Sequence, residues 1–105
     1  MKETKKNRDF SFNLGRAAYM AEEFKIAKES FEYILAYENP DDRQAIYYLA
    51  LTYFEQELYL KAINKLKKID TIPYGFYLTG SAYNALKKYE KRHPFSSLLK
   101  PRLFP

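Results

Sequence analysis

The sequence predicts an all-α protein built from repeated helix-turn-helix units, and three observations support this class. Apolar and small residues recur at spacings of three and four over most of the chain. A pattern of small and aromatic residues returns after 35 residues. Glycine and proline are scarce, at three and five in 105 residues, which leaves too little turn-forming sequence for a many-stranded β fold.

The repeat is clearest in two stretches of the chain. The first copy reads Leu14-Gly15-x-Ala17-x-Tyr19 and then Phe24-x-x-Ala27-x-x-x-Phe31. The second copy reads Leu49-Ala50-x-Thr52-Tyr53-Phe54 and then Tyr59-x-x-Ala62-x-x-x-Leu66. A partial third copy, displaced by 30 residues, reads Gly80-x-Ala82-Tyr83 and then Tyr89. Each full copy is long enough for two helices.

The first pair of helices is expected over residues 12–20 and 24–35, where the apolar spacing is helical. The acidic pair Glu22-Glu23 falls in the turn between them. Asn39-Pro40-Asp41-Asp42 ends the pair, because proline disfavours continuation of a helix and aspartate caps the next one. A second pair is expected over 42–55 and 59–69, and a fifth helix over 73–88.

These residues resemble the tetratricopeptide repeat, a helix pair of about 34 residues, over positions 9–90. The resemblance divides the chain into a charged N-terminal arm (1–8), repeats at 9–41 and 42–72, a partial repeat at 73–90, and a basic and apolar tail (91–105). It implies a right-handed superhelix of about five helices. The small residues at 15, 50 and 80 would let the first helix of each repeat approach its neighbour closely.

The third copy departs from the pattern, because Arg92 stands where a small residue is expected and His93-Pro94 follows it. Either the array ends in an atypical cap or the chain is a piece of a longer repeat protein. The tail 94–105 is apolar enough to fold back over the fifth helix, and the alternatives are that it pairs with another chain or stays loose. Self-association through the incomplete repeat is therefore an option.

Composition argues against an enzyme and against a metal or cofactor site. There is no cysteine, and His93 is the single histidine. The acidic pairs lie at turns and helix starts, and neither a phosphate-binding glycine loop nor a nucleophile motif is present. The absence of cysteine, of an apolar leader and of a stretch near twenty apolar residues favours a cytoplasmic protein.

Charge is distributed unevenly along the chain. Residues 1–60 carry eight Lys or Arg and eleven Asp or Glu, whereas residues 61–105 carry ten and two. A basic end can bind nucleic acid, and the cluster Lys87, Lys88, Lys91 and Arg92 is the candidate. The simpler interpretation is a solvated helix end whose cations complement the helix dipole.

The expected function is that of a protein-interaction scaffold. The resemblance implies a concave groove, lined by the first helix of each repeat, that holds a peptide or helix of a partner. It aims nine residues at that groove: Phe12, Arg16, Tyr19, Tyr47, Leu51, Phe54, Tyr77, Ser81 and Asn84. Tyrosine and phenylalanine suit an interface because they give large contact areas at low entropic cost. The alternatives are a nucleic-acid-binding helical domain and an oligomerising fragment, and several of the nine could instead complete the core.

One subtype of the family is improbable for this chain. Members that clamp acidic C-terminal tails present a set of Lys, Asn and Arg side chains, and the corresponding positions here are Phe12, Arg16, Tyr48, Tyr74 and Leu78. Only Arg16 is basic, so an apolar or mixed peptide is the better expectation.

Overall fold

The computed structural model describes residues 2–93, and within them the chain forms five α-helices and no strand. The elements are α1 (Lys2–Met20), α2 (Phe24–Tyr33), the π-helical turn η1 (Ile34–Glu38), α3 (Arg43–Glu55), α4 (Tyr59–Leu66) and α5 (Pro73–Arg92). The all-α prediction is confirmed. The tail residues 94–105 lie outside the described part of the chain, and so does the prediction about where they fold.

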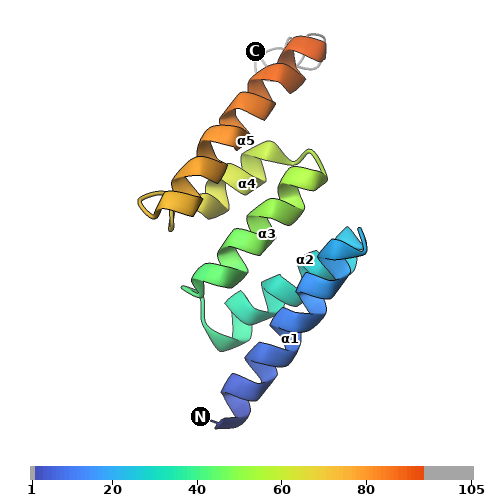
Figure 1. The fold of residues 1–105 in the computed structure, drawn as a ribbon, viewed down its shortest axis with the longest axis vertical. Helices are drawn as coiled ribbons and strands as arrows, with labels where there is room; N and C mark the ends of the chain where they lie inside the picture. The colour runs from blue at the N-terminus through green and yellow to red at the C-terminus, as the bar shows by residue number, and fades with distance from the viewer. Residues whose placement is uncertain (1, 94–105) are drawn as a thin grey trace, which may run out of the picture.

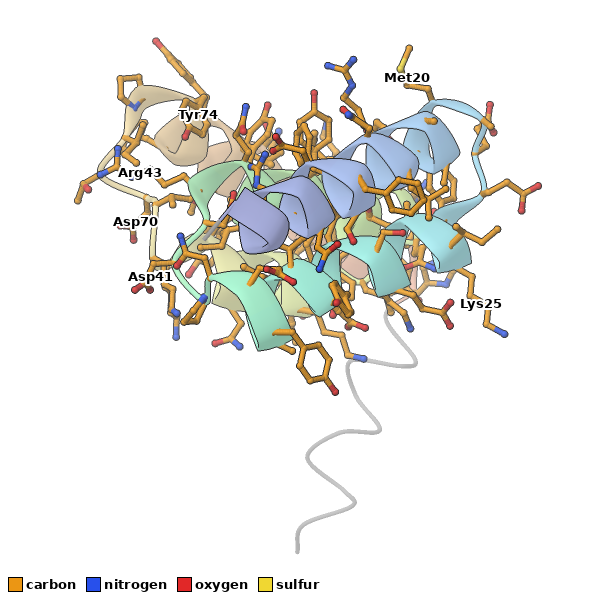
Figure 2. The ribbon with its side chains drawn as sticks, turned by 90° about the horizontal axis from the view of Figure 1, so that it is seen from below. Met20, Lys25, Asp41, Arg43, Asp70 and Tyr74 are labelled. Atoms are coloured by element: carbon orange, nitrogen blue, oxygen red, sulfur yellow. The ribbon has the colours of Figure 1, made fainter. Side chains whose placement is uncertain are left out.

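The helices lie in two layers that build an elongated molecule of 51 × 28 × 27 Å. α1, α3 and α5 form one layer, and α2, η1 and α4 form the other (Figures 1 and 2). Each helix packs mainly against its neighbours in the sequence, and α3 also touches both α1 and α5. The start of α1 and the end of α5 lie at opposite ends of the long axis (Figure 1).

The 35-residue repeat is present in the backbone as well as in the sequence. Glu22 and Glu57 each lie two residues after the first helix of a pair, and both adopt positive φ, at 63° and 62°. The same amide-to-carbonyl hydrogen bonds close the two turns: Glu22 to Tyr19 and Glu57 to Phe54 at 3.0 Å, and Glu23 to Ala18 and Leu58 to Tyr53 at 2.8 Å. A bond that spans five residues around a left-handed position is the Schellman helix ending.

The remaining boundaries follow from local chemistry. Asp42 accepts a hydrogen bond from the Ala45 amide and caps α3, as the sequence indicated. Pro73 begins α5, where its missing N–H costs nothing. Two helix ends differ from expectation, because α4 stops at Leu66 and α5 continues through Tyr89 to Arg92. Tyr89, which matches the start of the second helix in the other two copies, therefore belongs to α5.

The core runs between the two layers. Phe31, Ile34, Leu49 and Leu66 are fully buried, and the small residues Ala27, Ala45, Ala50, Ala62 and Ala82 are also at 0% exposure. Alanine at these positions lets helix backbones approach closely. Gly15 has the same role, because a Cβ there would lie 2.8 Å from the Phe31 ring and 3.0 Å from Ser30 Cβ.

Gly80 corrects the sequence prediction. It was expected to let α5 approach a neighbouring helix, but within the described residues no atom lies within 4 Å of the place a Cβ would take. The close contact of α5 is at Gly75 instead, where a Cβ would overlap the carbonyl oxygen of Ile69. The partial third repeat therefore packs differently from the first two.

The N-terminal residues also differ from expectation. Residues 1–8 were set apart as a charged arm, whereas α1 begins at Lys2 and includes most of them. Arg8 is packed into the structure, as described below.

Candidate functional site

A row of tyrosines crosses the layer formed by α1, α3 and α5. Tyr19 of α1 contacts Tyr48 of α3, with ring centroids 6.0 Å apart. Tyr48 contacts Tyr47 at 5.7 Å, and Tyr47 contacts Tyr74 of α5 at 5.0 Å. All three contacts are edge-to-face, the geometry that the charge distribution of aromatic rings favours. We call these four residues the tyrosine row.

The core fixes the tyrosine row from beneath. Tyr48 stacks on Phe31 of α2 at 5.7 Å and meets the edge of Phe12 of α1 at 5.4 Å. Because Tyr48 is held by two helices, its neighbour Tyr47 projects at a set angle toward α5. Tyr19, Tyr47 and Tyr48 are partly buried, and Tyr74 is 40% exposed. The row therefore combines ordered side chains with apolar surface that is open to solvent.

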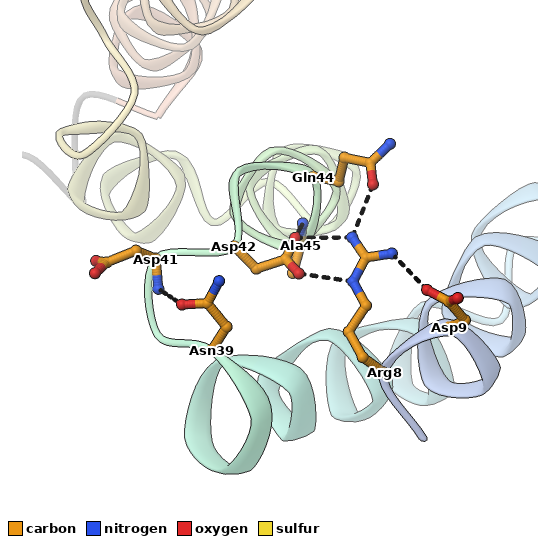
Figure 3. A network of polar contacts seen from close by, with 7 residues as sticks. All are labelled: Arg8, Asp9, Asn39, Asp41, Asp42, Gln44 and Ala45. Atoms are coloured by element: carbon orange, nitrogen blue, oxygen red, sulfur yellow. Dashed lines mark hydrogen bonds and ion pairs between the residues drawn. The ribbon is translucent and has the colours of Figure 1, made fainter. Parts of the chain in front are cut away.

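An ion-pair network holds α1 to the start of α3 and so fixes the spacing of the helices that carry the row (Figure 3). Arg8 Nε and Nη2 donate to the two carboxylate oxygens of Asp42 at 2.7 and 2.9 Å, and Nη2 also donates to Gln44 at 2.7 Å. The Arg8 guanidinium carbon lies 4.6 Å from the centroid of the Phe12 ring. A bidentate pair of this kind is directional as well as attractive.

Asp42 is ionised in this network. Burial of Asp42 acts to raise its pKa, but the hydrogen bond from Arg8, the amide of Ala45 and the Arg8 charge outweigh burial, so its pKa lies below the ordinary value. The same hydrogen bond from Arg8 to Asp42 holds the pKa of Arg8 above its ordinary value. The pair is therefore fully charged at neutral pH.

Tyr19 has an acidic neighbour at the edge of the row. Its hydroxyl donates to Glu55 across 3.5 Å. Burial raises the pKa of Tyr19, and the negative charge of Glu55 raises it further. Tyr19 therefore remains protonated and able to donate a hydrogen bond. Tyr19, Glu55 and the exposed Arg16 together place polar groups at the α1 end of the tyrosine row.

Tyr53 connects α3 to α2, on the side of α3 away from the tyrosine row. Its hydroxyl donates to Glu32 of α2 at 2.9 Å. Burial, followed by the hydrogen bond and charge of Glu32, raises the pKa of Tyr53 to about 12. Thr52, which is fully buried, donates to the Tyr48 carbonyl at 2.7 Å and so leaves no unpaired hydroxyl beneath the row.

The structure brings together part of the set predicted from sequence. Tyr19, Tyr47, Leu51 and Phe54 are partly buried and pack against the core from the α1 and α3 side. Arg16, Tyr77, Ser81 and Asn84 are exposed, with Tyr77 at 73%. Phe12 is a correction, because it is 7% exposed and packs between Phe31 and Tyr48. It supports the face from below and offers little surface to a partner.

Sequence reasoning missed Tyr48 and Tyr74 as part of this surface. Both were noted only as positions where a carboxylate clamp would need polar residues. The sequence signal that could have indicated them was the pair Tyr47-Tyr48. Adjacent residues on a helix point about 100° apart, so one tyrosine can pack into the core while the other projects toward a neighbouring helix. The contact between Tyr47 and Tyr74 depends on the spacing of α3 and α5, which no local pattern encodes.

Two cavities lie away from the tyrosine row and are lined by basic residues. One, of about 350 Å³, lies where α4 meets the end of α5, and its walls are Tyr59, Ala85, Lys88, Lys91 and Arg92. Another, of about 420 Å³, lies between η1 and α4, and its walls are Leu35, Pro40, Ile46, Asn64, Lys65, Lys67 and Lys68. Neither cavity includes any of the nine predicted contact residues.

Over the part of the chain that the structure describes, no group of three or more His, Cys, Asp or Glu side chains is placed to hold a metal ion. No helix among residues 2–93 combines the length and the apolar character needed to cross a bilayer. No protein-family model, curated protein or solved structure matches the chain.

Proposed function

We propose that this protein is a binding module that holds a segment of a partner protein against the α1, α3 and α5 layer, and that it performs no catalysis. The observation that supports this most strongly is the tyrosine row, which joins three helices through ordered rings yet leaves Tyr74 40% exposed. Ordered, partly exposed aromatics suit an interface, because they bury large areas with little loss of side-chain entropy.

The repeat architecture is consistent with this role. The two Schellman endings, 35 residues apart, support a relationship to tetratricopeptide-like helix pairs. Under this proposal the array forms a right-handed superhelix, with the first helix of each pair facing the partner. Arrays of this kind recognise partners along an extended face.

The chemistry of the face suggests an apolar or mixed segment as the ligand. Tyr47, Leu51 and Phe54 supply apolar contact area, while Arg16 and Glu55 flank it with opposite charges. A helix or strand with an apolar stripe and polar edges would complement this arrangement.

The proposal is tested with a displayed random-peptide library selected on the full chain. The selected peptides are then titrated against the wild type, Tyr47→Ala, Phe54→Ala and Tyr74→Ala. Loss of a central aromatic anchor costs about 2 kcal/mol or more, so we expect each variant to weaken binding by at least about tenfold.

Tyr37→Ala is the matched control. Tyr37 is 75% exposed and lies on η1, in the opposite layer. It should leave peptide affinity unchanged. Circular dichroism of each variant verifies that the helices remain. Selected peptides that bind all four variants equally, with folding intact, would show that the face is not the site.

The basic end of α5 supports a second candidate function, binding of nucleic acid. Lys88, Lys91 and Arg92 line the 350 Å³ cavity beside the buried Tyr59, so three side chains that can bind phosphate lie close together. We place it second because Lys91 and Arg92 already complement the dipole at the end of α5. Affinity for a single-stranded oligonucleotide that falls steeply with salt, and that is lost in Lys88→Ala with Lys91→Ala, would favour this function.

A further inference from the structure

One face of α5 is left uncovered by the described residues. It carries Phe76, Gly80 and Tyr83, spaced by four and three residues so that they lie on one side of the helix. Phe76 is 65% exposed and Tyr83 is 55% exposed. Apart from the adjoining backbone of α5 itself, no atom of the described residues lies within 4 Å of the position that a Cβ on Gly80 would occupy. We call these three residues the α5 stripe.

The internal repeat identifies the α5 stripe as a helix-packing face. With the 30-residue offset of the third copy, its equivalents in α3 are Ile46, Ala50 and Tyr53, which are only 2%, 0% and 5% exposed. α3 packs against both α2 and α4. Among residues 2–93, α5 has its extensive packing only with α4. The stripe therefore matches a surface that is buried by another helix elsewhere in this chain.

Gly80 lies inside α5, where a glycine lowers the stability of the helix. Glycine within a helix is destabilising by roughly 1 kcal/mol relative to alanine. At Gly15 and Gly75 close packing offsets this cost, because neighbouring atoms leave no room for a Cβ there. At Gly80 the described residues offer none. Close approach of a further helix at this point would supply it.

The distribution of charge along α5 indicates which helix fits. Residues 71–86 contain no charged side chain, and Gly80 lies near the middle of this span. Residues 87–92 then carry four basic side chains and one acid. A parallel copy of the helix would bring the two basic ends together, whereas an antiparallel copy crossing at Gly80 pairs the two uncharged spans and directs the basic ends apart.

We propose that the α5 stripe binds the α5 stripe of a second copy of this chain, in an antiparallel pair related by a two-fold axis near Gly80. Such a self-complementary contact is the commonest form of protein dimer. Phe76 of each copy packs beside Tyr83 of the other, because residues four before and three after the crossing lie at similar levels. The tyrosine row is on another side of α5, so the dimer does not depend on the proposed peptide-binding function.

Gly80→Leu provides the sharpest test, because leucine prevents the close approach of a second helix, and a Cβ at this position meets no described atom of the monomer outside the adjoining backbone of α5. Sedimentation equilibrium of the full chain over a range of concentrations should show a monomer–dimer equilibrium for the wild type. For Gly80→Leu we expect a dissociation constant at least about tenfold higher. Phe76→Lys should weaken the dimer similarly through the buried charge.

Ala17→Leu is the control, since it makes a comparable change at an exposed position of α1. It should leave the dissociation constant unchanged. In dilute solution, Gly80→Leu should also unfold at a higher temperature than the wild type, because leucine is the better helix former.

The alternative occupant of the stripe is the chain's own segment 94–105. A wild type that is monomeric at every concentration would overturn the proposal. The intramolecular alternative would also make Gly80→Leu less stable than the wild type at all concentrations, which is the opposite of our expectation.

Discussion

Arg8 shows how one side chain connects the repeats. It makes a bidentate pair with Asp42, which also caps α3 through the Ala45 amide, and its guanidinium lies over the Phe12 ring. The beginning of the first repeat and the beginning of the second are thus joined by a single charged group. This role was hidden in the sequence, because Arg8 belongs to a charged segment that looked like a solvated arm.

The pH dependence of this pair follows from the lowered pKa of Asp42. A carboxyl whose pKa is lower in the folded state contributes stability above its unfolded pKa and loses that contribution as pH falls through the folded pKa. In a double-mutant cycle with Arg8→Met and Asp42→Asn, we expect a coupling of about 1 kcal/mol at neutral pH. It should fall toward zero as the pH drops through the lowered pKa of Asp42.

Asparagine is chosen at position 42 because it also caps helices well, so the cycle isolates the ion pair from the cap. Urea unfolding at neutral and acidic pH measures the coupling. A coupling that does not change with pH would mean that the Asp42 charge contributes nothing to the contact.

At the scale of elements, the two helix pairs share their turn geometry, and α5 breaks the pattern. Glu22 and Glu57 occupy the left-handed region, which costs a residue other than glycine roughly 1–2 kcal/mol. Packing of the flanking helices offsets this cost in both pairs. No corresponding turn interrupts α5, which continues as one helix of 20 residues.

Two glycines of α5 provide a test at this scale, because the same substitution should have opposite effects. Gly75→Ala introduces a Cβ that overlaps the Ile69 carbonyl, so we expect a loss of about 2 kcal/mol in the free energy of unfolding. Gly80→Ala fills open space and improves helix propensity, so we expect a gain of about 0.5–1 kcal/mol in dilute protein. Urea denaturation of both variants measures the two changes in the free energy of unfolding. Changes of the same sign and size would contradict the packing assigned to the two glycines.

At the scale of the whole molecule, the protein is an elongated stack in which stability comes from contacts between neighbouring helices. α3 lies in the middle of the stack and is packed by α2 and α4. α1 and α5 lie at its two ends (Figure 1). The stack should therefore open from its ends inward.

Hydrogen exchange can measure this gradient. We expect the amides of α3 to exchange most slowly, and those of the first turns of α1 and the last turns of α5 to exchange fastest, because end elements open at lower free energy. If the proposed dimer forms, protection around Gly80 should rise with protein concentration while that of α1 does not. Uniform protection along the chain would contradict an array held by neighbour contacts.

The sequence determined the helical class and four of the turns or caps. These features depend on short-range chemistry: helical spacing of apolar residues, the Asp42 cap, Pro73 at the start of α5, and the turns at Glu22 and Glu57. The family resemblance also pointed to part of the candidate face, including Tyr19 and Tyr47.

The tertiary structure decided which residues of that repeat are buried and which are free. It placed Phe12 in the core and added Tyr48 and Tyr74 to the candidate face. It also showed that α5 packs closely against its surroundings at Gly75 and not at Gly80. The physical reason is that burial depends on the distance between helices. That distance is set by the summed packing of side chains far apart in the sequence, so the local pattern around one residue does not fix it.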